Sequence, residues 1–117
     1  MSRIKLLIID DEQDYCMLMK NFLSTKGYDV TVSYSLKEGL ELLYETKPAI
    51  LILDNNLPDG DGWDHCFDIA ARFPQLHIHL VSAHRHRSEL KDLASTITVW
   101  EKPISLNELE RSFHQQT

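Results

Sequence analysis

Residues 4–11 read IKLLIIDD, an apolar run that stops at two adjacent carboxylates. Residues 49–54 read AILILD and stop in the same way, at the single carboxylate of Asp54. Continuous apolar runs of this length are typical of strands that are buried on both faces of a parallel sheet. The carboxyl ends of such strands share one edge, so Asp10, Asp11 and Asp54 are predicted to converge on a small pocket. Such a pocket combines a site for a hard cation with a candidate nucleophile.

Five strand-like runs recur at a steady interval, and segments with helical periodicity separate them. The predicted strands are residues 5–9, 29–33, 49–53, 77–81 and 96–101. This alternation predicts an α/β fold in which helices cover both faces of a parallel five-stranded sheet. The sequence contains no repeat, low-complexity tract or linker, so residues 1–117 are interpreted as one (βα)5 domain.

Capping residues and breakers mark the expected helices. A first helix ends before Gly27, and five of its apolar residues are expected on one face: Tyr15, Leu18, Met19, Phe22 and Leu23. Capping boxes at residues 35–38 and 105–108 open the second and the last helix. A third helix is predicted over residues 62–73, where a proline ends it, and a short fourth one over residues 88–94.

Composition and charge disfavour some classes of binding partner and indicate where the protein is located. A net charge of -6 over 117 residues disfavours direct binding to nucleic acid or to an anionic membrane surface. No apolar run approaches the length of a membrane span and the N-terminus lacks a signal peptide, which predicts a cytoplasmic location. The two cysteines, Cys16 and Cys66, are interpreted as buried reduced thiols. Because the chain starts at Met1, an output domain, where there is one, is expected after Thr117.

Polar residues also end the later predicted strands, at Ser82 and at Lys102. We expect Asp11 and Asp54 to bind Mg²⁺ directly, Asp10 to hold one of its waters, and a loop carbonyl after Asp54 to complete the protein ligands. A carboxylate is an established nucleophile for phosphoryl transfer, so Asp54 is predicted to attack phosphorus. The ammonium group of Lys102 supplies positive charge to the phosphoryl oxygens and Ser82 supplies a hydrogen bond. The proline after Lys102 fixes the backbone there and allows a cis peptide bond.

This set of residues resembles the receiver domain of two-component response regulators. The motifs are Asp10-Asp11, Asp54, Pro58, Gly62, Ser82-Ala83 and Lys102-Pro103, and they span essentially the whole chain in the family's order. The resemblance implies a flavodoxin-like fold with strand order 2-1-3-4-5. It also implies that the domain is not an enzyme acting on other substrates, but catalyses only its own Mg²⁺-dependent phosphorylation and dephosphorylation.

The resemblance assigns roles to individual residues. It makes Asp54 the phosphoacceptor, which becomes 4-aspartylphosphate when a sensor histidine kinase or a histidine phosphotransfer protein donates the phosphoryl group. Asp10 and Asp11 form the Mg²⁺ pocket, and Asn56 contributes its backbone carbonyl. Ser82 is the switch hydroxyl and Lys102 contacts the phosphoryl group.

The chain departs from the family pattern in its last strand. Receivers usually carry Phe or Tyr three residues before the lysine, whereas this chain has Val99 there and Trp100 one position later. Strand alternation sends Trp100 to the face opposite Val99. Ser82, Val99 and Trp100 are therefore the expected switch residues. The departures fall on the surface that many receivers use to dimerise or to dock on a downstream partner.

Four histidines surround the fourth predicted strand: His77, His79, His84 and His86. No cysteine or acid at a matching position completes a tetrahedral metal site, so they are interpreted as ordinary strand and loop histidines. His84 lies two residues after Ser82, a position that tunes the lifetime of the phosphoryl group in this family. We hypothesise that His84 and Asn56 set the dephosphorylation rate.

Two other functions compete with the phosphoacceptor. The first is an interaction module of receiver fold that works without phosphorylation, since the altered switch region is compatible with a loss of coupling. The second is a small phosphatase resembling the haloacid dehalogenases. That family needs an aspartate two residues after its nucleophile, and this chain has Asn56 there.

Overall fold

A computed structural model describes residues 3–83 and 96–114 of the chain. Five parallel strands form one sheet in the order β2-β1-β3-β6-β7. The strands of this sheet are β1 (Ile4–Ile9), β2 (Tyr28–Ser33), β3 (Ile50–Asp54), β6 (His77–Ser82) and β7 (Ile97–Glu101). This order confirms the predicted 2-1-3-4-5 arrangement of a flavodoxin-like fold, and every predicted strand is present to within one residue at either end.

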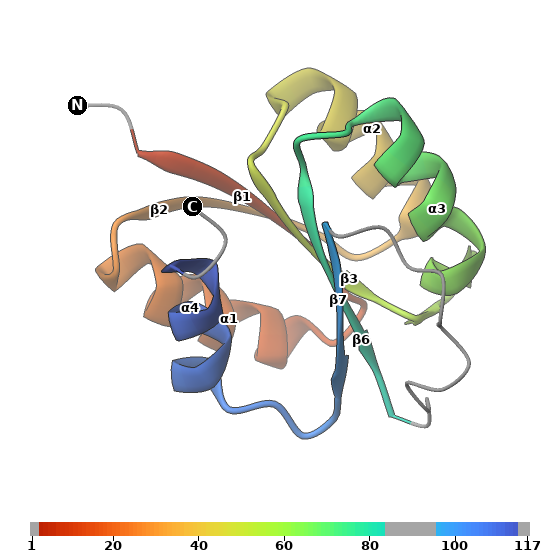
Figure 1. The fold of residues 1–117 in the computed structure, drawn as a ribbon. Coiled ribbons are helices and arrows are strands. Elements are labelled where there is room, and N and C mark those ends of the chain that lie inside the picture. Colours follow the sequence, from red (N-terminus) through yellow and green to blue (C-terminus); the bar gives the residue numbers. More distant parts are fainter. Residues whose placement is uncertain (1–2, 84–95, 115–117) are drawn as a thin grey trace.

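Helices cover both faces of the sheet, as predicted (Figure 1). The two on one face are α2 (Leu36–Thr46) and α3 (Gly62–Arg72), and the two on the other are α1 (Gln13–Thr25) and α4 (Leu106–His114). The strand β1 shows why both faces are filled. Its Leu7 and Ile9 point into the core under α2 and α3, while Leu6 and Ile8 point into the core under α1 and α4.

Local signals in the sequence explain where the helices begin and end. The hydroxyl oxygens of Ser35 and Ser105 accept hydrogen bonds from the backbone N–H groups of Glu38 and Glu108, both at 3.3 Å, so both predicted caps are confirmed. Gly27 follows α1 with a φ of +96°, a conformation that glycine adopts without steric cost.

One detail of α1 was predicted wrongly. Leu18 is 56% exposed, and the buried residues of the helix are Cys16, Met19 and Leu23. These three repeat at i, i+3 and i+7, which is a narrow stripe. Leu18 comes one residue before Met19, so it is turned about 100° away from the sheet. Tyr15 and Phe22 pack partly at the border of this stripe.

The connection between β3 and α3 has a regular structure of its own. It contains a small antiparallel hairpin made of β4 (Asn56–Leu57) and β5 (Gly60–Asp61). The peptide bond between Lys102 and Pro103 is cis. Both cysteines are free and buried. The predicted helix over residues 88–94 lies outside the described residues, as do His84 and His86. Among the described helices, none is both long and apolar enough to cross a bilayer.

Candidate functional site

The polar residues that end the strands come together at one edge of the sheet. Asp10 directly follows β1, Asp54 is the last residue of β3, Ser82 is the last residue of β6, and Lys102 directly follows β7. Strand register brings these ends level, because Asp54 pairs with Val81 and Ser82 pairs with Glu101 in adjacent parallel strands. The predicted convergence at the carboxyl edge is therefore present in the fold.

The three acids form a compact cluster. One carboxylate oxygen from each of Asp10, Asp11 and Asp54 lies within 4.8 Å of the others. Asp10 and Asp54 are each only 2% exposed, whereas Asp11 is exposed at the mouth. Among the residues that the structure describes, this is the one group of three acids, histidines or cysteines that is close enough to hold a metal ion. The cluster is thus closed on the protein side and open on one side to solvent.

Burial makes the negative charges in this cluster unfavourable. The pKa of Asp10 is raised to about 6, chiefly by burial and also by the charge of Asp54, although the backbone N–H of Glu12 donates to its Oδ1 at 2.9 Å. Burial likewise raises the pKa of Asp54, against the opposing influence of Lys102. Two buried carboxylates with raised pKa values are stabilised by any cation that enters between them.

Lys102 brings a positive charge to the same place. Its Nζ lies 3.3 Å from Oδ1 of Asp54 and 3.5 Å from Oε1 of Glu12. Partial burial alone would lower the pKa of Lys102. The nearby carboxylates, of which Asp54 has the largest influence, outweigh burial and raise this pKa. The ammonium group is therefore charged at neutral pH and lies within reach of any group bound at Asp54.

These residues line a cavity of about 490 Å³. Its walls come from residues at or just after the carboxyl ends of β1, β3, β6 and β7 and from the hairpin: Asp11, Glu12, Asp54, Asn55, Asn56, Ser82, Ala83 and Lys102. Sequence reasoning missed Glu12 and Asn55. Glu12 directly follows the acidic doublet, which was a usable signal. Asn55 offered no signal, because its role depends on hydrogen bonds to other elements.

Asn55 anchors the chain just after Asp54. Its backbone N–H donates to the carbonyl of Val81 at 2.8 Å, and its side-chain Oδ1 accepts from the backbone N–H of Trp63 at 3.0 Å. The backbone N–H of Gly62 donates to the Asn55 carbonyl at 2.9 Å. A Cβ atom on Gly62 would lie 2.6 Å from the carbonyl oxygen of Asp54, so only glycine allows α3 to start this close to the site.

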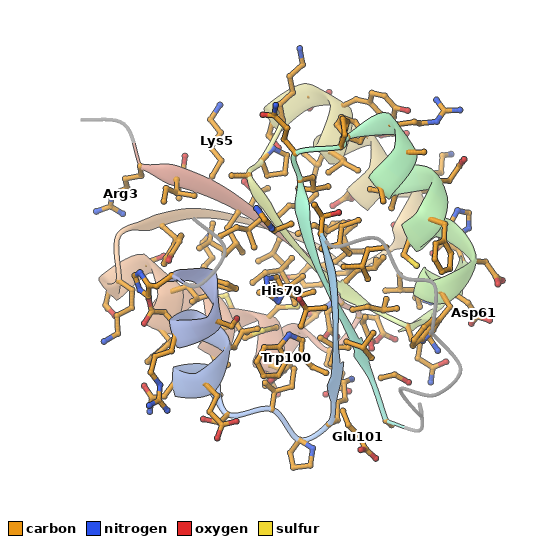
Figure 2. All side chains as sticks on the ribbon, viewed as in Figure 1. Arg3, Lys5, Asp61, His79, Trp100 and Glu101 are labelled. Carbon is orange, nitrogen blue, oxygen red and sulfur yellow. The ribbon has the colours of Figure 1, made fainter. Side chains whose placement is uncertain are left out.

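The two switch candidates of β7 point in opposite directions. Val99 belongs to the core under α2 and α3, and Trp100 packs against the core under α1 and α4, as strand alternation predicts. Trp100 donates its indole Nε1–H to Nδ1 of His79 at 2.9 Å, and His79 is fully buried (Figure 2). The ring of Phe113 from α4 packs edge-on against His79. The predicted role of His84 concerns a residue outside the described part of the chain.

The acid cluster suits a hard divalent cation. Its donors are all oxygen atoms, as Mg²⁺ and Ca²⁺ prefer. Oδ1 of Asp54 is buried, and although Nζ of Lys102 lies 3.3 Å away, it accepts no hydrogen bond of good geometry from any described residue, so it has capacity for a further ligand. The residues present therefore fit the magnesium ion that the sequence predicts.

Comparison with known proteins agrees with this geometry. The family model for the response regulator receiver domain matches residues 6–114. A sensor protein from Polaromonas sp. JS666 is 31% identical, with a TM-score of 0.83, and the match covers 97% of this chain and 95% of that one. A two-component response regulator from Clostridium difficile is 25% identical, with a TM-score of 0.85 and the same coverage of 97% and 95%.

A third structure supports the fold alone. The chemotaxis response regulator CheY4 of Vibrio cholerae is 18% identical, has a TM-score of 0.84, and is matched over 99% of this chain and 100% of that one. Phosphorylation and Mg²⁺ binding are general features of receiver domains, and histidine kinases or phosphotransfer proteins are the family's partners. The match over nearly the whole chain and the shared fold lead to one conclusion: this chain belongs to the family of response regulator receiver domains.

Proposed function

We propose that this chain is a phosphoacceptor switch in which Asp54 takes a phosphoryl group from a sensor histidine kinase or a histidine phosphotransfer protein. One observation carries the proposal. The buried carboxylate of Asp54 lies within 4.8 Å of two other carboxylates and 3.3 Å from the ammonium group of Lys102, at the wall of an open cavity. A nucleophile, a cation site and a counter-charge are thus combined in a space large enough for a phosphoryl group.

Four groups are proposed to hold the magnesium ion. Asp11 and Asp54 bind it through carboxylate oxygens, Asn56 through its backbone carbonyl, and Asp10 through a bound water. When bound, Mg²⁺ offsets the repulsion between these carboxylates and the incoming phosphoryl oxygens. This assignment agrees with the raised pKa values of Asp10 and Asp54, which burial causes and which a bound cation would lower.

The transfer step is a direct displacement at phosphorus. A carboxylate oxygen of Asp54 forms a bond to phosphorus while the bond from phosphorus to the donor's histidine nitrogen breaks, and the electron pair leaves with that nitrogen. The ammonium group of Lys102, which pairs with Asp54 before the transfer, interacts with the negatively charged phosphoryl oxygens after it. The hydroxyl of Ser82 donates a hydrogen bond to one of these oxygens. In the reverse direction of the switch, water attacks phosphorus, releases inorganic phosphate and restores the carboxylate.

The remaining roles concern the output of the switch. We assign Ser82, Val99 and Trp100 to the conformational response, and His84 with Asn56 to the rate of dephosphorylation. The response is expected to change binding to a downstream protein or effector domain, with phosphorylation-dependent dimerisation as one form of output. The proposed setting is the cytoplasm, where the kinase or phosphotransfer protein has access to Asp54.

The test uses the intact chain with a small phosphoryl donor. Wild-type protein and Asp54→Asn are incubated with acetyl phosphate and Mg²⁺, and intact mass is measured with and without EDTA. We expect the wild type to gain the mass of one phosphoryl group only in the presence of Mg²⁺, and Asp54→Asn to gain none. Absence of an adduct, together with no Mg²⁺-dependent binding of beryllofluoride, would overturn the proposal in favour of an interaction module that works without phosphorylation.

A further inference from the structure

The hairpin β4–β5 carries Asn56, the residue proposed to give a backbone carbonyl to the metal ion. It is attached to the rest of the protein in three ways. Asn55 and Gly62 hold its two ends near β6 and α3. Leu57 anchors its middle, because its side chain is buried in the core under α2 and α3. The third attachment is at the tip, through Asp59.

Asp59 joins the tip of the hairpin to the start of α2. Its two carboxylate oxygens accept hydrogen bonds from the backbone N–H groups of Leu36 and Lys37, at 2.8 and 2.9 Å. These hydrogen bonds lower the pKa of Asp59, and the one from Leu36 has the larger influence, although Asp59 is exposed. The first N–H groups of a helix have no partner within the helix, and an anion next to them is stabilised by the helix dipole. A residue 22 or 23 positions away in sequence thus completes the N-terminus of α2 beside the Ser35 cap.

The start of α2 is in turn bonded to the other side of the acid cluster. The hydroxyl of Ser33, at the end of β2, donates to the carbonyl of Ser35 at 2.9 Å. The carbonyl of Ser33 accepts the backbone N–H of Asp10 at 3.0 Å. A continuous series of hydrogen bonds therefore runs from Asp10 through the start of α2 to Asp59 and the hairpin.

We propose that Asp59 is a positioning residue for metal binding: it tethers the β4–β5 hairpin to α2 and so holds the Asn56 carbonyl at the distance that Mg²⁺ requires. The inference rests on the proposed function and deepens it. Magnesium needs near-ideal octahedral geometry, so its affinity responds strongly to small displacements of a ligand. Residues that orient ligands without touching the metal change affinity by about 10- to 100-fold in other sites.

The same hairpin provides a matched control. Asp61 is exposed, belongs to β5 and makes no side-chain capping bond to α3. Its position in the fold is marked in Figure 2. Asp59→Ala and Asp61→Ala remove the same charge from the same hairpin, and only the first removes the tether. Any general effect of charge on Mg²⁺ affinity is therefore shared by the two variants.

The experiment measures the Mg²⁺ concentration that gives half of the maximal phosphorylation rate with acetyl phosphate. We expect Asp59→Ala to raise this concentration about 3- to 10-fold, a smaller effect than that of a group bonded directly to a ligand. Asp61→Ala is expected to stay within about twofold of wild type, because exposed charges are screened. Asp59→Asn keeps one acceptor oxygen and is expected to fall between the two. At saturating Mg²⁺ all variants should reach the wild-type rate.

Two results would overturn the inference while the proposed function stands. Equal Mg²⁺ requirements for Asp59→Ala and Asp61→Ala would show that only charge matters. A reduced rate of Asp59→Ala that saturating Mg²⁺ does not restore, together with a lower melting temperature, would show a purely structural role. Failure of the proposed function is recognised earlier and separately, because wild-type protein would then form no Mg²⁺-dependent adduct, and the inference would fall with it.

Discussion

The acid cluster and the His79–Trp100 pair lie only a few residues apart on neighbouring strands, but their polar groups are balanced in opposite ways. In the cluster, burial raises the pKa values of Asp10 and Asp54, and the charge of Asp54 raises that of Asp10 further. In the pair, the indole N–H of Trp100 meets the Nδ1 acceptor of His79 at 2.9 Å, in the core under α1 and α4. The cluster keeps raised pKa values despite the ammonium group of Lys102, whereas the pair already contains donor and acceptor. Unfavourable burial of negative charge thus occurs at the place where a ligand is proposed to bind, whereas the neighbouring polar contact stabilises the fold.

The largest effect is expected when the cluster loses the ammonium group of Lys102. We predict that Lys102→Met slows phosphorylation by acetyl phosphate about 100- to 1,000-fold, comparable with the removal of one preorganised donor from other active sites. The rate is measured at saturating Mg²⁺ by intact mass. Lys20→Met, which removes an exposed lysine from α1, serves as the control. A rate for Lys102→Met within threefold of wild type would show that the ammonium group does not stabilise the transferred phosphoryl group.

The second prediction concerns the pH dependence of the metal-free protein. The raised pKa of Asp10 means that the folded state holds a proton which the unfolded state releases, so this contribution to stability is present below pH 4 and is lost as pH rises through about 6. A change from 3.8 to about 6 corresponds to about 3 kcal/mol. Asp10→Asn removes the charge and keeps an acceptor for Glu12. We expect it to unfold with nearly wild-type free energy at pH 4 and to be up to about 3 kcal/mol more stable at pH 7.

This prediction is checked by urea unfolding in EDTA at several pH values. Asp11→Asn is the control, because Asp11 is exposed and its charge costs little to keep in water. If the free energies of unfolding of Asp10→Asn and wild type differ by the same amount at pH 4 and pH 7, the charge of Asp10 does not destabilise the folded state. The acid cluster would then not differ from the His79–Trp100 pair in the balance of its buried polar groups.

The smallest effect is expected for the pair, where donor and acceptor are already matched. Trp100→Phe leaves His79 without the indole donor and His79→Leu leaves the indole without its acceptor, and each should lower the free energy of unfolding by about 1 to 3 kcal/mol. The double variant isolates the hydrogen bond, for which we expect a coupling energy of about 1 kcal/mol. Mg²⁺ affinity should be unchanged in all three. A coupling energy near zero would mean that the pair stabilises the fold by packing alone.

The sheet could be predicted because the signals for its strands are local. The strand bounds follow from continuous apolar runs such as residues 49–53, and the cap of Ser35 is encoded within four residues. The order of the strands in the sheet was not predicted from such local signals, because it came from the family resemblance and not from periodicity. Leu18 was placed wrongly because a helix of apolar composition does not reveal how wide its buried stripe is. That width depends on how closely the sheet approaches α1.

The site shows the same division. Five polar residues could be assigned to the carboxyl edge of the sheet, because each lies at the end of a predicted strand and parallel strands align their ends. These residues are Asp10, Asp11, Asp54, Ser82 and Lys102. The hydrogen bonds from the backbone N–H groups of Leu36 and Lys37 to Asp59, and from Trp100 to His79, join residues about 20 positions apart. No local sequence pattern predicts these hydrogen bonds, because the partners are backbone groups or single side chains that become neighbours only when the helical layers pack on the sheet. Those packing contacts also decide which carboxylates are buried.

By itself, the sequence determined which residues form strands, where the strands stop, and which chemical groups stand at their ends, since period and composition are properties of neighbouring residues. The tertiary structure decided the distances among those groups, the burial that raises the pKa values of Asp10 and Asp54, and the tether from the hairpin to α2. These quantities depend on how two helical layers close over the sheet. They are therefore set by contacts between segments that are far apart in the chain.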